Sequence, residues 1–172
     1  MSLIYGLAGH VDHGKTSLIQ ALIGFNADQT PEEKRRGLTI DLSFSFCEDN
    51  HKRIFFIDVP GHEKFVKNYL AGVFGFHKLL LIVSAIEGIR EQTLEHLEIA
   101  KLVGLRHIVV VLTKIDCVDF EHLDFLQLSI EELLSSYNFH NDGIYRCSIY
   151  QQETINHLKH ALFNQPFPTP HV

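Results

Sequence analysis

The sequence contains no tryptophan, one methionine and three cysteines among its 172 residues. Cys47, Cys117 and Cys147 are odd in number and far apart, and they form no C-x-x-C pair. This usage argues against a disulfide framework and indicates the reduced thiols of a cytoplasmic protein. The chain also lacks a signal peptide and any apolar run of about 18 residues, so we expect no membrane span.

Positive charge is also in short supply. The 15 Lys and Arg residues face 21 Asp and Glu residues, which gives a net charge of −6. This balance argues against a domain that grips nucleic acid by bulk electrostatics, although a local patch or further domains could still contact RNA. The 12 histidines are scattered. His157 and His160 lie three residues apart on a predicted helix without further ligands nearby, so no zinc site is expected.

The pattern that is present favours one α/β domain. Apolar runs alternate with amphipathic segments, and hydrophobic residues make up 45% of the chain. Residues 1–164 are predicted to form the domain, and the proline-rich residues 165–172 a linker. We expect strands at 3–8, 41–46, 54–57, 79–83, 108–112 and 144–147, with helices at 15–24, 63–74, 91–103, 123–137 and 153–163. The strands 41–46 and 54–57 are expected to pair as a hairpin through a turn at 48–51.

Residues 9–16 read G-H-V-D-H-G-K-T and fit the phosphate-binding pattern G-x-x-x-x-G-K-[ST]. Gly9 and Gly14 permit backbone angles that a side chain would block, and the turn directs N–H groups at an anion. Lys15 can reach the β- and γ-phosphates, and the Thr16 hydroxyl can bind Mg²⁺. A chance glycine-rich turn is the alternative, but a predicted strand before the motif and a predicted helix after it favour the phosphate loop.

Two further motifs follow predicted strands. Asp58 begins D-x-x-G, and a carboxylate there can hold Mg²⁺ through water, while Gly61 offers an N–H group to the γ-phosphate. Lys114 and Asp116 follow the strand at 108–112. A carboxylate at this position can accept hydrogen bonds from N1–H and the 2-amino group of guanine, whereas adenine offers neither donor. Taken separately, these residues could be a turn glycine and a surface salt bridge; together with the phosphate loop they indicate guanine specificity.

Together these motifs resemble the GTP-binding domain of a translational GTPase. G-H-V-D-H-G-K-T and D-V-P-G-H are the forms used by elongation factor Tu and its relatives. Residues 31–42, which read P-E-E-K-R-R-G-L-T-I-D-L, resemble the compact first switch of the selenocysteine-specific elongation factors. The segment 25–38 breaks the α/β pattern. By itself it could be a solvated charged loop, whereas the resemblance implies a switch that orders with GTP.

The resemblance implies a Ras-like fold, with a six-stranded, mostly parallel sheet and about five helices, and it assigns roles to residues. His62 would orient the attacking water, with Lys15 and Gly61 at the phosphates. Mg²⁺ would be held by Thr16, Thr39 and Asp58, and Asp12 would help to bind a monovalent cation. The nucleotide contacts would be His10, Val11, Asp12, His13, Gly14, Lys15, Thr16, Ser17, Thr113, Lys114, Asp116, Ser148 and Ile149.

The chain departs from the family pattern at two places. Thr113 stands where most relatives have Asn, and a hydroxyl can take over part of the amide's bracing role between loops. Residues 147–149 read C-S-I where relatives have Ser-Ala-x. Ser148 aligns with the position whose backbone N–H meets the guanine O6.

The resemblance implies a GTPase switch domain that helps deliver selenocysteyl-tRNA to the ribosome, slow alone and stimulated there. The tRNA and an mRNA hairpin would contact mainly further domains absent from this chain, which would then be a fragment. Three alternatives remain: another translational GTPase such as an initiation factor, a small-molecule P-loop kinase, and a non-hydrolysing nucleotide-gated module. The compact first switch argues against the first, and Lys114 and Asp116 would have no purpose in the second.

Overall fold

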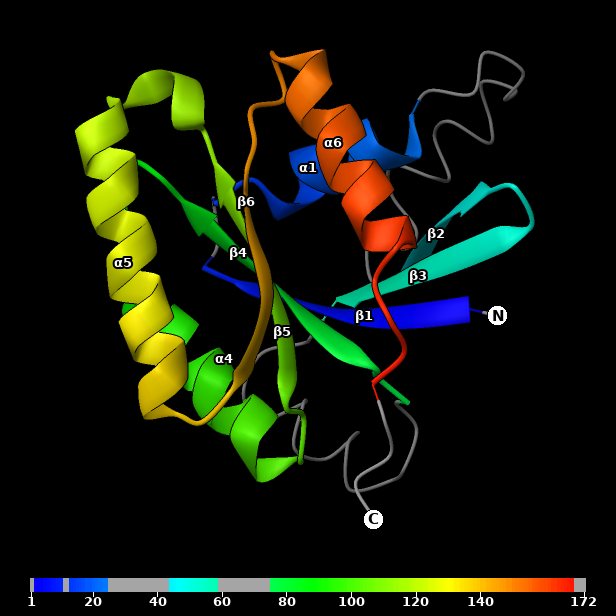
Figure 1. The fold of residues 1–172 in the computed structure, drawn as a ribbon, viewed down its shortest axis with the longest axis horizontal. Coiled ribbons are helices and arrows are strands. Elements are labelled where there is room, and N and C mark those ends of the chain that lie inside the picture. Colours follow the sequence, from blue (N-terminus) through cyan, green and yellow to red (C-terminus); the bar gives the residue numbers. More distant parts are fainter. Residues whose placement is uncertain (1, 11–12, 25–43, 59–74, 169–172) are drawn as a thin grey trace.

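The computed structural model describes residues 2–10, 13–24, 44–58 and 75–168. These residues form a six-stranded sheet in the order β2-β3-β1-β4-β5-β6, with four α-helices packed against it (Figure 1). All neighbouring strands are parallel except the β2–β3 pair, which is antiparallel. The predicted α/β class and the predicted hairpin are therefore confirmed. The strands are Ser2–Gly9 (β1), Phe44–Asp49 (β2), Lys52–Asp58 (β3), Lys78–Ser84 (β4), His107–Thr113 (β5) and His140–Arg146 (β6).

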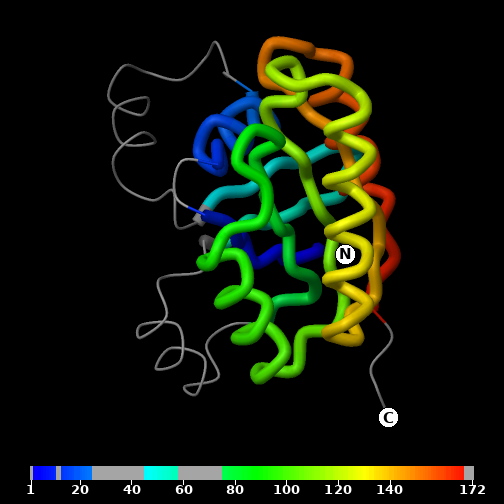
Figure 2. Tube along the Cα trace, turned by 90° about the vertical axis from the view of Figure 1, so that its left-hand side faces the viewer, coloured from blue at the N-terminus to red at the C-terminus, as the bar shows by residue number. Residues whose placement is uncertain are grey.

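The helices divide between the two faces of the sheet. They are Lys15–Ile23 (α1), Glu91–Leu102 (α4), Phe120–Ser136 (α5) and Gln152–Phe163 (α6), with a short 3-10 turn at Ile115–Cys117. The helices α4 and α5 share one apolar core with β4 and β5, and α1 and α6 share the other with β1, β3, β4 and β5. Figure 2 views the domain from the side on which α5 lies. The helix predicted at 63–74 and the switch segment predicted at 25–38 lie outside the described residues.

Between their polar first and last residues, the central strands β4 and β5 are wholly apolar, because helices cover both of their faces. All seven residues of β4 are buried, and successive side chains enter opposite cores. Leu79 and Leu81 face the α4–α5 side, whereas Leu80 and Ile82 face the α1–α6 side. The prediction that these two runs are strands buried on both faces is confirmed.

Two strands, β2 and β6, have an end that lies three or more residues from its predicted position. β2 continues to Asp49, and the connecting turn is only Asn50 and His51, both at positive φ (46° and 68°). Glu48 pairs across the hairpin with Arg53, and their side chains form an ion pair of 3.1 Å. The predicted turn at 48–51 was therefore too long, because paired charges can extend a strand past its apolar residues.

The last strand, β6, begins at His140 rather than at residue 144. The first residues of β6 are polar, so the pattern of apolar runs did not predict them as part of a strand. One of these polar residues, Asp142, has two partners, on β4 and β5. Its carboxylate contacts the Lys78 ammonium at 2.7 Å and His107 Nδ1 at 3.0 Å. Lys78 is 1% exposed and also donates to Gln165 Oε1 at 2.9 Å. The first residue of the predicted linker thus lies against the amino-terminal end of the sheet.

The carboxyl ends of the parallel strands gather the loops that carry the motifs. β1 ends at Gly9, β4 at Ser84 and β5 at Thr113, and the register of the ladders places these ends side by side. Ligands of open α/β sheets bind at this edge. None of the helices in the described part of the chain is both long and apolar enough to cross a membrane.

Candidate nucleotide-binding site

The turn from β1 into α1 requires glycine at two positions. Gly9 has φ 151°, and a Cβ atom there would stand 2.3 Å from the Ile82 carbonyl oxygen. Gly14 has φ 88° and is the N-cap of α1. Both positions are in a backbone region that other residues rarely adopt. The chain can therefore pass close to β4 and turn at once into a helix.

Lys15, Thr16 and Ser17 form the first turn of α1. A helix leaves its first N–H groups without intrahelical partners, and its positive end favours an anion. The start of α1 therefore has the backbone chemistry of a phosphate site. Asp58 ends β3, and its backbone pairs with Leu7 of β1, so two of the three predicted magnesium ligands, Thr16 and Asp58, come from the same edge of the sheet.

Two buried histidines, His96 and His13, connect this turn to the rest of the domain by hydrogen bonds. His96 of α4 is 5% exposed, and its Nδ1 accepts a hydrogen bond from the Gly9 N–H at 3.0 Å. Burial, together with the nearby charge of Lys15, lowers the pKa of His96 to about 4. The imidazole is therefore neutral at physiological pH, which is the state in which Nδ1 can accept the bond.

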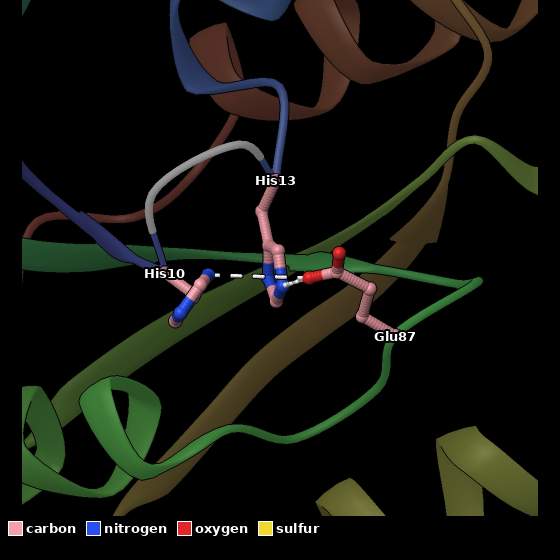
Figure 3. Close-up of side chains that lie close together, drawn as sticks. All are labelled: His10, His13 and Glu87. Atoms are coloured by element: carbon pink, nitrogen blue, oxygen red, sulfur yellow. Dashed lines mark hydrogen bonds and ion pairs between the residues drawn. The ribbon is translucent and has the colours of Figure 1, made fainter.

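His13 is fully buried. Figure 3 shows its ring between the phosphate loop and Glu87. Its Nδ1 accepts from the Ser84 N–H at 3.2 Å, and its Nε2 lies 2.7 Å from Glu87 Oε2. Burial lowers the pKa of His13 against the opposing effect of Glu87. His13 was predicted to be a nucleotide-contacting residue, and the structure engages its side chain with Ser84 of β4 and Glu87 of the following loop. Its backbone is paired as well, since the N–H donates to the His10 carbonyl at 3.2 Å and the carbonyl accepts from Thr113 Oγ1 at 2.7 Å.

A cavity of about 340 Å³ lies beside the start of α1. It brings together three segments far apart in the sequence: the phosphate loop, the residues after β5 and the residues after β6. Six residues of the predicted site line its wall: Gly14, Ser17, Thr113, Lys114, Asp116 and Ile149. Leu18, Cys117, Cys147 and Tyr150 also line it. None of these four was predicted as a contact residue, although Cys147 begins the C-S-I segment and Leu18, Cys117 and Tyr150 each directly follow a predicted residue.

Thr113 links two of these segments. Its hydroxyl is buried and donates to the His13 carbonyl oxygen at 2.7 Å, with the Val83 carbonyl at 3.4 Å. Lys114, the next residue, adopts a left-handed conformation with φ 58°. The hydroxyl at the position of the usual Asn therefore connects the end of β5 to the phosphate loop, as the replacement led us to expect.

Asp116 faces the loop after β6. Hydrogen bonding from Ser148 lowers the pKa of its carboxyl group, which keeps it an anionic acceptor. Ser148 itself is 1% exposed, and its N–H donates to Thr154 Oγ1 at 3.0 Å. We expected this N–H to face the guanine O6; in the structure Thr154 holds it. Ile149 follows and lines the cavity.

Several predicted site residues lie outside the described part of the chain. They are Val11, Asp12, Thr39, Gly61 and His62, and the same holds for the side chain of Asp58. The phosphate loop is thus described on both sides of Val11 and Asp12, and the two loops predicted to bind the base are described in full. His10, at the loop's beginning, has its Nδ1 3.9 Å from Glu87 Oε2.

Comparison with known proteins agrees with this geometry. A family model described as the elongation factor Tu GTP binding domain matches residues 2–166. The selenocysteine-specific elongation factor of Escherichia coli (strain K12) is 43% identical over 165 residues, which cover 95% of this chain and 27% of that protein. The chain spans 22–27% of the length of three such curated relatives.

Solved structures give the same picture. The crystal structure of a bacterial selenocysteine-specific elongation factor aligns with a TM-score of 0.73 and 41% identity, over 93% of this chain and 28% of that one. Translation elongation factor SelB from Methanococcus maripaludis, solved with the GTP analogue GPPNHP, aligns with a TM-score of 0.71 and 28% identity, over 96% of this chain and 35% of that one. With its phosphate loop, its base-side cavity and a family match over almost its whole length, the chain belongs to the elongation factor Tu GTP-binding domain family.

Proposed function

We propose that this chain is the GTP-binding and GTP-hydrolysing switch domain of an elongation factor that delivers selenocysteyl-tRNA to the ribosome. The observation that carries the nucleotide part is the cavity in which Gly14 and Ser17 of the phosphate loop meet Lys114 and Asp116. Relatives named selenocysteine-specific elongation factors, at up to 48% identity, support the rest.

The guanine base would enter the cavity and be recognised by Asp116. Its carboxylate accepts hydrogen bonds, and guanine presents two neighbouring donors where adenine presents none. The Lys114 stem would lie along the base, and Ile149 would close the pocket on the other side of Asp116. Adenine would leave the carboxylate without its donors, and an unmatched polar group costs affinity.

The phosphates would lie on the start of α1, with Lys15 at the β- and γ-oxygens. Thr16, Thr39 and Asp58 would hold Mg²⁺, which neutralises phosphate charge when bound. All three offer the oxygen atoms that this ion prefers. Asp12 would contribute to a monovalent cation site near the same phosphates.

Hydrolysis would transfer the γ-phosphoryl group to water through positioning and charge stabilisation. His62 would orient the attacking water, with Gly61 contacting the γ-phosphate. We expect slow turnover from the domain alone, because the ribosome would bring His62 into place. A longer protein carrying His62→Ala should keep its GTP affinity and lose most of its ribosome-stimulated turnover; unchanged stimulated rates would remove His62 from the mechanism.

Nucleotide binding is tested directly by calorimetry on nucleotide-stripped protein. We expect heat on adding GDP or GTP with Mg²⁺, and none with ATP at the same concentration. Equal heat with ATP would contradict guanine recognition. The tRNA assignment needs the longer protein: titration with selenocysteyl-tRNA should show much tighter binding than titration with seryl-tRNA on the same tRNA body, and equal affinities would contradict it.

A further inference from the structure

The loop after β4 brings a carboxylate to the phosphate loop. Residues 84–88 form a tight turn in which the Gly88 N–H donates to the Ser84 carbonyl at 2.8 Å. This turn presents Glu87, whose Oε2 lies 2.7 Å from His13 Nε2. Figure 3 shows the Glu87 carboxylate directed at the His13 ring. The Glu87 side chain is about one-third exposed, whereas the His13 side chain is fully buried. A surface carboxylate therefore reaches a buried residue of the phosphate loop.

The hydrogen bonds determine where the His13 proton lies. Nδ1 accepts from the Ser84 backbone N–H at 3.2 Å, and a backbone N–H can only donate. The proton of the neutral ring is therefore on Nε2, which donates to Glu87. His10, His13 and Glu87 also have the composition of a metal site, with ligand atoms within 4.8 Å of one another. A metal on His13 Nε2 would need the proton on Nδ1, opposite the Ser84 N–H, so this geometry favours a hydrogen-bonded chain over a metal site.

The backbone of His13 is part of the phosphate loop. Its N–H donates to the His10 carbonyl at 3.2 Å, and its carbonyl accepts from Thr113 Oγ1 at 2.7 Å. Gly14 and Lys15, the next two residues, begin α1. A change in the His13 ring would therefore move the residues that face the phosphates.

We propose that Glu87 is a positioning residue for nucleotide binding, acting through His13. It fixes the tautomer and orientation of the His13 ring, and the ring in turn holds the phosphate loop against the end of β4. Glu87 contacts neither the base-side cavity nor the start of α1 among the described contacts. The proposal rests on the proposed nucleotide binding and adds to it a residue outside the sequence motifs.

The test compares variants by the rate at which fluorescent GDP dissociates, measured by stopped flow. Glu87→Ala removes the acceptor for His13 Nε2–H, and dissociation should accelerate about tenfold, as expected for the loss of a hydrogen bond to a charged group. Glu87→Gln keeps an acceptor oxygen without the charge and should stay within about threefold of the parent. Glu95→Ala, which removes an exposed carboxylate from α4, is the matched control and should not change the rate.

A second comparison asks whether Glu87 acts through His13. In His13→Asn, the amide oxygen can replace Nδ1 as acceptor for Ser84, but nothing reaches Glu87. Adding Glu87→Ala to this variant should change the dissociation rate no further, because the two positions form one unit. Additive effects, or a parent-like rate in Glu87→Ala, would overturn the proposal. GDP binding by the parent protein is measured in the same experiment, so a failure of nucleotide binding itself is seen separately.

The metal alternative gives a distinct result. Titration of the parent with Co²⁺ and observation of the visible d–d bands should show no site that His13→Asn removes. A tight site lost in both His13→Asn and Glu87→Ala would overturn the assignment of a hydrogen-bonded chain.

Discussion

Replacing Thr113 by Val should loosen bound nucleotide without changing the shape of the buried side chain. The two residues have nearly the same volume, so the change removes the hydroxyl and keeps the packing. That hydroxyl is 2.7 Å from the His13 carbonyl oxygen and joins the base-side loop to the phosphate loop. Without the hydroxyl, the His13 carbonyl loses this donor. Thr113 is only 5% exposed, so the bond that is lost is a buried one.

The size of the effect follows from that single bond. A buried neutral hydrogen bond contributes roughly 1 kcal/mol, and an acceptor left without a donor adds to the loss. The free energy of unfolding should fall by about 1–2 kcal/mol in nucleotide-free protein. The same hydrogen bond would hold the two loops together around the nucleotide. If part of its free energy is lost from the bound state, GDP dissociation should accelerate by about three- to tenfold.

Thr113→Ser is the matched control. Serine keeps the donor and removes one buried methyl group, which costs about 1 kcal/mol in packing. Urea unfolding should therefore show both variants destabilised, whereas stopped-flow release of fluorescent GDP should be fast only in Thr113→Val. Parent-like release from Thr113→Val, or equal acceleration in both variants, would refute the link between this hydroxyl and nucleotide retention.

The remaining predictions concern the phosphates, the base and a buried histidine. Lys15→Ala should weaken GDP and GTP binding by orders of magnitude in calorimetry, and retained tight binding would exclude Lys15 from the phosphate site. Asp116→Asn should shift preference from GTP to xanthosine triphosphate in competition assays, because an amide can donate to the xanthine C2 oxygen; an unchanged preference for guanine would contradict the role of Asp116. His96 has a pKa of about 4 in the folded protein and is neutral there, whereas in the unfolded chain it takes up its proton near the usual histidine pKa of 6.5. The free energy of unfolding should therefore fall as pH drops from 6.5 to 4, by at most about 3 kcal/mol from this group. In urea unfolding at a series of pH values, His96→Asn should flatten this part of the profile. An unchanged slope would show that His96 is not the source of the pH dependence.

The sequence already contained most of the fold and the centre of the site. Apolar runs such as those of β4 and β5 are local features, and their alternation with amphipathic segments predicted the parallel sheet. The phosphate loop could be found because its chemistry requires glycines, Lys15 and Thr16 within eight contiguous residues. The strands β2 and β6 were less well predicted, since charged pairs extend the first and the Asp142 contacts stabilise the polar start of the second.

What the sequence determined by itself was therefore the chemistry that adjacent residues can supply, namely a glycine-rich turn suited to an anion and a carboxylate that follows β5, together with the order of strands and helices along the chain. Only the tertiary structure decided which polar side chains hold that turn. Gly9 meets His96 across 87 positions, His13 meets Glu87 across 74 and Thr113 across 100. A histidine or threonine has no periodic signature of burial, and a hydrogen bond between distant segments exists only once the sheet has brought their strand ends together.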